Sequence, residues 1–129
     1  MIRYRNEGIC KIVYIDRPAA PRLAQIRAEL SCIAGLHVTS SWNDNLELMP
    51  QGVGKGAALL ELADRLQIAR EQTMAIGDFD NDLDMVQAAG VGVAMGNASP
   101  AVLRAAAFVT ADNDHDGVAQ AVLRFAPYV

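Results

Sequence analysis

The chain has 129 residues, of which 52% are hydrophobic and 20% are charged, and this composition fits one ordinary globular protein. Its net charge of −4 argues against a nucleic-acid-binding protein, because such proteins usually present a basic face. The sequence has no apolar run of the ~18 residues that a membrane span needs, and its first residues do not resemble a signal peptide. We therefore predict a cytoplasmic protein with neither a nucleic acid nor a membrane as partner.

The first part of the chain predicts a strand and then a helix. Residues Cys10–Asp16 form a β-branched and aromatic run of strand length. Arg17-Pro18 breaks this run, Pro21 is suited to the first turn of the next helix, and Gly35 is its expected stop. Four apolar residues at spacings of three and four define one face of this helix: Leu23, Ile26, Leu30 and Ile33.

Two further strands are predicted at residues 36–42 and 46–50, with the turn Asn43-Asp44-Asn45 between them. We expect these strands to pair as a hairpin. The opening segment is therefore predicted to have the order βαββ.

Several single residues of this segment are expected to serve packing. Cys10 and Cys32 are predicted to be small buried hydrophobic residues, since two cysteines indicate neither a disulfide framework nor a metal site. Trp42, the single tryptophan, is expected in the core or in an interface. His37 alternates with apolar neighbours and is expected to pack rather than to bind a ligand.

The pattern changes after residue 50. From Lys55 onward helices and strands alternate, which predicts a parallel sheet with helices on both faces. The predicted strands are Thr73–Ile76, Val91–Met95 and Phe108–Thr110. The predicted helices begin at Lys55, after Gly77-Asp78, at the N-cap Ser99 and at about Gly117. The first of these helices is expected to bury Ala58, Leu59, Leu62, Ala63 and Leu66. We therefore divide the chain into segments 1–50 and 51–129.

Four aspartates lie within seven residues after the strand Thr73–Ile76: Asp78, Asp80, Asp82 and Asp84. A helix N-terminus stabilises each nearby carboxylate by only about 0.3–1 kcal/mol, and like charges at helical spacing repel. Carboxylate oxygens are ligands of Mg²⁺, often together with phosphate. Ligands of open parallel sheets bind at the carboxyl ends of the strands, where Lys55 and Asn97 are also expected. This pattern favours a magnesium and phosphate site; the alternative is a set of acidic helix caps.

Three strings carry a family resemblance: Gly54-Lys55-Gly56, Gly77-Asp78-Phe79-Asp80-Asn81-Asp82 and Val93-Ala94-Met95-Gly96-Asn97-Ala98. In this order and spacing they resemble the C-terminal half of the haloacid dehalogenase superfamily, most closely its Cof-like phosphatase branch. The resemblance implies an α/β fold. Segment 51–129 is similar to the second half of a Rossmann-like core, and segment 1–50 to the closing part of the α/β cap domain.

The resemblance also implies a function, namely magnesium-dependent hydrolysis of phosphate monoesters such as sugar phosphates or nucleotides. Lys55 would neutralise the phosphoryl group and the aspartyl-phosphate intermediate, and Asn81 would contact phosphate. Asp78 would be a ligand of Mg²⁺, and Asp82 would steady either Lys55 or the water molecules of the metal. Asp80 and Asp84 receive no role from the resemblance.

The sequence departs from the family at the nucleophile, because it contains no Asp-x-Asp-Gly-Thr segment. Asp16 follows an apolar strand but lacks the second aspartate of that segment. We therefore expect a truncated family member that is inactive as an isolated chain. The alternative is a non-catalytic remnant that binds phosphate or a protein partner. A receiver-like signalling domain fits poorly, because Lys55 precedes the aspartates.

The missing nucleophile strand has a structural consequence. In the family this strand pairs with the equivalent of Thr73–Ile76, which would here be left at the edge of the sheet. Exposed edges tend to pair with another chain. We therefore predict a homodimer, or an association with the missing N-terminal portion, through this edge.

Overall fold

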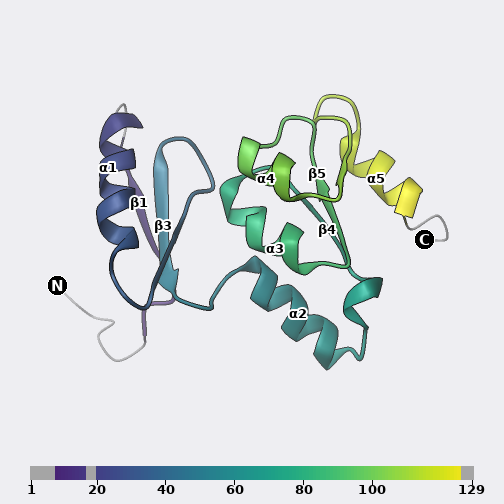
Figure 1. Cartoon of the computed structure of the whole chain (residues 1–129), viewed down its shortest axis with the longest axis horizontal. Coiled ribbons are helices and arrows are strands. Elements are labelled where there is room, and N and C mark those ends of the chain that lie inside the picture. Colours follow the sequence, from purple (N-terminus) through teal and green to yellow (C-terminus); the bar gives the residue numbers. More distant parts are fainter. Residues whose placement is uncertain (1–7, 17–19, 126–129) are drawn as a thin grey trace. The chain divides into compact units, whose positions relative to one another are not determined.

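The computed structural model describes residues 8–16 and 20–125. The chain folds into two compact units, one up to Val53 and one from Gly54 onward, and each unit has its own three-stranded sheet (Figure 1). The predicted α/β fold class is confirmed, whereas the predicted break at Arg17-Pro18 lies outside the described residues. In the described part of the chain, no helix has the length and apolarity needed to cross a membrane.

The first unit is an antiparallel sheet with one helix. Its elements follow the predicted order: β1 (Ile12–Ile15), α1 (Ala20–Ser31), β2 (Leu36–Thr39) and β3 (Asn45–Pro50). β2 and β3 pair as the predicted hairpin, but β3 also pairs with β1 and is therefore the central strand. Its residues Leu46, Glu47 and Leu48 are buried. Whether this unit is part of a cap domain stays a prediction.

A buried carboxylate fixes the central strand of this unit. Glu47 is 7% exposed, and its Oε2 accepts a hydrogen bond from Lys11 Nζ at 2.7 Å. Its Oε1 accepts another from Ser41 Oγ at 2.6 Å. A buried charge is tolerated where it is paired and hydrogen-bonded, so Lys11 and Ser41 make the burial of Glu47 possible.

Two packing predictions for this unit are wrong, and a third is narrowed. Cys10 and Cys32 are exposed rather than buried. Trp42 is 66% exposed and does not lie in the core, so its place in an interface stays a prediction. Ile33 is 52% exposed, because α1 ends at Ser31 and the chain then turns away from the helical path. Gly35 completes this turn with a φ of +80°, a conformation that favours glycine.

The second unit alternates strands and helices. Its strands are β4 (Met74–Gly77), β5 (Val91–Ala94) and β6 (Phe108–Val109), in the order β4-β5-β6 and parallel throughout. Its helices are α2 (Lys55–Arg65), α3 (Leu83–Ala88), α4 (Pro100–Ala105) and α5 (Gly117–Phe125). Two 3₁₀ turns, Arg70–Gln72 and Asp80–Asp82, precede β4 and α3. Among the described strands, β4 therefore has a neighbour on one side only.

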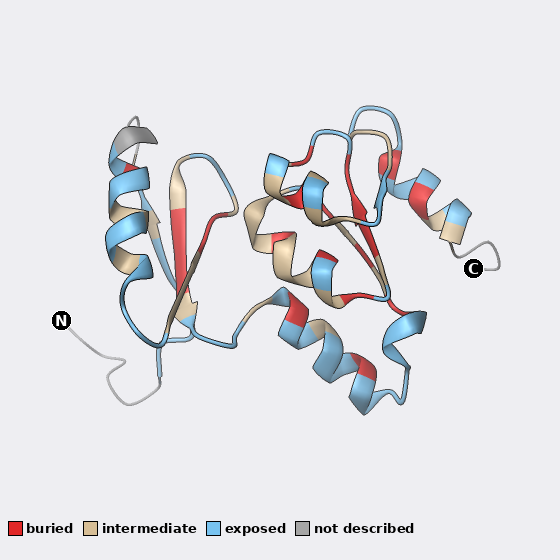
Figure 2. Ribbon diagram, viewed as in Figure 1, coloured by how far each residue is buried: buried red, intermediate tan, exposed pale blue. Residues whose placement is uncertain are grey.

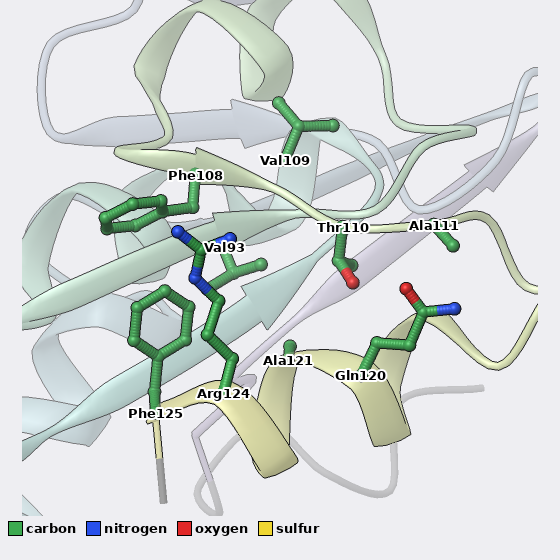
Figure 3. Close-up of a pocket in the computed structure, with 9 residues that line it drawn as sticks. All are labelled: Val93, Phe108, Val109, Thr110, Ala111, Gln120, Ala121, Arg124 and Phe125. Carbon is green, nitrogen blue, oxygen red and sulfur yellow. The ribbon is translucent and has the colours of Figure 1, made fainter.

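The alternation of side chains along β5 places helices on both faces of this sheet, as predicted. On one face a Cβ on Gly92 would lie 2.1 Å from the carbonyl oxygen of Val86, so α3 rests directly on β5. The core cluster comprises Val86, Ala94, Ala98 and Val102, together with Met95. The side chain of Met95 reaches the start of α5, where a Cβ on Gly117 would lie 2.9 Å from Met95 Cε. Val93 points to the opposite face, where it meets α5 (Figure 3). Figure 2 shows the buried residues gathered along these strands.

One flank of α5 faces β6. Gln120 and Arg124 line a cavity of about 170 Å³ together with Phe108 (Figure 3). The guanidinium carbon of Arg124 lies 5.0 Å from the ring centre of Phe108. Val118 and Val122, one helical turn apart on the other flank, therefore lie on the side of β4. Val118 is 53% exposed.

The predicted apolar face of α2 is largely wrong. Only Gly56 and Ala63 are buried in this helix, whereas Leu62 is 56% and Leu66 is 60% exposed. Most of α2 is coloured as exposed in Figure 2. α2 packs against α3 through its small residues, because a small side chain lets two helices approach closely. Leu62 and Leu66 consequently remain exposed, whereas Leu59 is half-buried.

We expect Val102→Ala to lower the free energy of unfolding by about 2 kcal/mol, because it removes two buried methyl groups and leaves a cavity. Val102 is 0% exposed. Urea denaturation followed by circular dichroism measures the change. The matched control is Val53→Ala, at an exposed position after β3, which should change the free energy by less than about 0.5 kcal/mol. Equal effects of both variants would contradict this description of the core.

Candidate functional site

The loops that follow the three parallel strands form one connected edge. The backbone N–H of Ser99 donates to the carbonyl of Asp78 at 2.8 Å. Further along, the N–H of Asn113 donates to Asn97 Oδ1 at 3.2 Å, and the N–H of Gly96 donates to the carbonyl of Ala111 at 3.1 Å. The aspartate cluster therefore stands at the carboxyl ends of the strands, where open parallel sheets bind ligands.

Asp82 lies at the centre of this edge and is only 6% exposed. Its Oδ1 accepts a hydrogen bond from Lys55 Nζ. Its Oδ2 faces two backbone N–H groups, those of Asp78 at 3.1 Å and Phe79 at 3.4 Å. One carboxylate thus joins the start of α2 to the loop that follows β4.

Gly77 makes room for this carboxylate. A Cβ on Gly77 would lie 2.4 Å from Cβ of Asp82, a distance at which the two atoms clash. Any larger residue at the end of β4 would push Asp82 out of its position. Packing against Asp82 therefore requires glycine at position 77.

The Asp82 carboxylate is held in its charged form. Burial alone would favour the neutral acid. The hydrogen bond and the positive charge of Lys55, with the N–H groups of Asp78 and Phe79, outweigh burial and hold the pKa of Asp82 below its usual range. Lys55 and Asp82 therefore form an ion pair at neutral pH, in which the lysine side chain stays 48% exposed.

The other two predicted site residues are placed differently. Asp78 is exposed, and in the described part of the chain its carboxylate has no hydrogen-bond or ion-pair partner. Asn81 is half-buried in the 3₁₀ turn Asp80–Asp82. The structure thus brings Lys55 and Asp82 into direct contact, while Asp78 joins them through its backbone N–H.

Asp80 and Asp84, which received no role from the sequence, are both hydrogen-bonded. Asp80 Oδ1 accepts from Ser99 Oγ at 3.0 Å, and Ser99 is the predicted N-cap of α4. Asp84 Oδ2 accepts from the backbone N–H of Gly56 at 3.0 Å. The contact between Asp84 and Gly56 has a weak signal in the sequence. Gly54 stands at the N-cap of α2 and has no side chain that could accept a hydrogen bond from the first turn of the helix.

The donor set available for a metal is small. No group of three or more His, Cys, Asp and Glu side chains suited to a metal ion occurs within residues 8–16 and 20–125. Asp78 offers one carboxylate without a protein partner. Mg²⁺ in phosphate-handling sites takes one or two carboxylates, substrate oxygens and water, so Asp78 fits as one ligand of such a site.

We expect the stability that Asp82 contributes to depend on pH. Because its pKa is lower in the folded than in the unfolded chain, this contribution is complete above about pH 4 and is lost as the pH falls through the folded pKa. The difference in free energy of unfolding between wild type and Asp82→Asn should therefore shrink as the pH is lowered from 7 to 3. Urea denaturation at several pH values measures it. Asp64→Asn, at an exposed position of α2, is the control and should show little difference throughout.

The chain is similar in sequence to a family of known hydrolases. The family model of the haloacid dehalogenase-like hydrolases matches residues 2–122. 5-amino-6-(5-phospho-D-ribitylamino)uracil phosphatase YcsE of Bacillus subtilis is 40% identical over 98 residues, 76% of this chain and 39% of the relative. Phosphoglycolate phosphatase of Methanoculleus marisnigri is 42% identical over 84 residues, 65% of this chain and 36% of the relative.

A solved structure of a protein described as a member of the same family is also similar to this chain. A haloacid dehalogenase-like hydrolase from B. subtilis superposes with a TM-score of 0.82 at 36% identity, covering 89% of this chain and 40% of that one. The chain spans less than half the length of these relatives. The resemblance inferred from the three sequence strings is confirmed: the chain belongs to the family of haloacid dehalogenase-like hydrolases.

Proposed function

We propose that this chain contributes part of the active site of a magnesium-dependent phosphohydrolase that acts on small phosphorylated metabolites. The two relatives named above are phosphatases of such compounds. In this proposal Lys55 and Asn81 bind the phosphoryl group, Asp78 is a ligand of Mg²⁺, and Asp82 holds Lys55 in place and can reach the water molecules of the metal. The proposed location is the cytoplasm.

The contacts of Asp82 carry the proposal. This carboxylate binds Lys55 with one oxygen and the backbone of the Asp78 loop with the other. A cationic side chain and a free carboxylate are thereby held at one edge of the sheet. A positive group and a metal ligand placed together suit the negative charge that develops on a transferring phosphoryl group.

The magnesium ion would neutralise charge on the phosphoryl oxygens when it is bound. At the end of β4 this chain supplies the carboxylate of Asp78, which has no partner among the described residues, so we propose that the remaining protein ligands come from another segment. That segment would also supply the nucleophile, because the 129 residues contain no Asp-x-Asp-Gly-Thr motif. Without a nucleophile, covalent phosphoryl transfer has no first step.

The free edge of β4 is the proposed place of contact with that segment or with a second copy of the chain. The carbonyls of Thr73 and Gly77 accept hydrogen bonds from β5. Every second residue of a parallel strand faces the same neighbour, so the backbone groups of Met74 and Ile76 point to the open edge. The half-exposed Val118 lies on the same side of the unit. Apolar side chains beside an unpaired strand favour association.

We expect the isolated chain to hydrolyse p-nitrophenyl phosphate at the background rate. Joined to the N-terminal portion of the 40% identical B. subtilis phosphatase YcsE, it should hydrolyse the compound with Mg²⁺ and not with EDTA. Asp78→Ala in the joined protein should lower kcat at least about 100-fold, because a metal ligand is lost. The exposed Asp64→Ala is the matched control and should leave kcat unchanged.

Two results would contradict this proposal. A magnesium-dependent activity of the isolated chain that Asp78→Ala abolishes would show that no further segment is required. A joined protein that folds and yet stays at background would argue against phosphate hydrolysis. The second result would favour a non-catalytic module that binds phosphate or a protein.

We expect the isolated chain to sediment as a dimer at micromolar concentration. Met74→Pro should shift it to the monomer, because proline removes a backbone donor that points to the open edge and leaves the bonds to β5 intact. Sedimentation velocity measures the change, and circular dichroism checks that the fold is retained. A wild-type monomer across this concentration range would rule out the self-association.

A further inference from the structure

We infer that Asp84 is a positioning residue for Lys55, acting through the first turn of α2. Within residues 8–16 and 20–125, no hydrogen bond or ion pair joins Lys55 and Asp84 directly. Asp84 lies at the start of α3 and holds the backbone of Gly56, the residue that directly follows Lys55. The importance of this role for phosphoryl binding rests on the function proposed above, whereas the role itself does not.

The contact between Asp84 and Gly56 is close and specific. Asp84 Oδ2 accepts the backbone N–H of Gly56 at 3.0 Å. A Cβ on Gly56 would lie 2.6 Å from the carbonyl oxygen of Asp84, so the backbones of the two helices meet at this point. Gly56 is buried. The start of α2 is therefore seated directly on the start of α3.

This contact supplies the side-chain cap that the N-terminus of α2 lacks. The first N–H groups of a helix have no partner within the helix, and a side chain at the N-cap usually accepts one of them. Gly54 occupies the N-cap of α2 and makes no side-chain bond. Asp84 accepts from the second residue of the helix instead. A carboxylate at this end is also favoured by the helix dipole.

The consequence for Lys55 follows from its place in the chain. Lys55 is the first residue of α2, and its side chain reaches Asp82. Asp82 and Asp84 stand two residues apart at the junction of the 3₁₀ turn and α3. Asp82 binds the lysine ammonium, and Asp84 fixes the backbone from which the lysine extends. Without Asp84, the first turn of α2 would lose its hydrogen bond to α3. The ammonium group of Lys55 would then no longer be held in a fixed position beside Asp82.

The chain offers a clean way to test this, because Lys11 and Lys55 are its only two lysines. Labelling lysine with ¹³C at Cε gives one signal for each, and NMR relaxation measures the mobility of each side chain. We expect Lys55 to lose its restricted motion in Asp84→Ala. Asp84→Asn should retain it, because the amide oxygen can still accept the Gly56 N–H. Lys11, which is bound to Glu47 in the other unit, should not change in either variant.

Three controls separate positioning from a general loss of stability. Asp82→Ala should free Lys55 directly. Asp64→Ala removes an exposed charge from α2 and should leave Lys55 restricted. Val102→Ala destabilises the core without touching α2 and should also leave it restricted.

The inference would be overturned if Asp84→Ala lowered the melting temperature but left the Lys55 mobility unchanged. It would equally be overturned if Val102→Ala freed Lys55 as much as Asp84→Ala does. The NMR result does not depend on catalysis, so it stands or fails separately from the phosphatase assay. Restricted Lys55 motion that depends on Asp84, together with a joined protein that folds and yet stays at the background rate, would keep the inference and remove the proposed function.

Discussion

The interaction on which the candidate site depends is the set of three hydrogen bonds accepted by the Asp82 carboxylate. This buried carboxylate holds Lys55 with one oxygen and the loop after β4 with the other. A buried charge without partners would be costly, so the lysine, the two N–H groups and the carboxylate stabilise one another. Because these groups belong to α2 and to the loop after β4, their contact sets the position of one relative to the other. Loss of any member would leave the others without support.

Close backbone approach is the second constraint. Gly77 admits the side chain of Asp82, and Gly56 admits the backbone of Asp84. Both glycines have ordinary backbone conformations, so the space beside them is what requires glycine here. The four aspartates of the cluster consequently have different surroundings. Asp82 is buried in an ion pair, Asp84 caps α2, Asp80 bonds to Ser99, and Asp78 is exposed.

Much of the second unit could be predicted from the sequence. The N-cap Ser99, the start of α2 at Lys55 and the three strands all follow from local patterns, because capping and strand propensity act over a few residues. The contact between Lys55 and Asp82 followed from a family resemblance rather than from spacing. The errors concern burial, because Leu62, Leu66, Cys10 and Cys32 are all exposed. An apolar residue type indicates that burial is favourable but not that a partner surface is present.

The sequence by itself determined the order of elements, the family and the position of the aspartates after a strand, because these depend on neighbouring residues. The tertiary structure decided which aspartate does what. Asp80 and Asp84 look alike in the sequence, and their partners Ser99 and Gly56 lie 19 and 28 residues away along the chain. Contacts over such separations depend on how helices and strands pack, which local pattern does not specify.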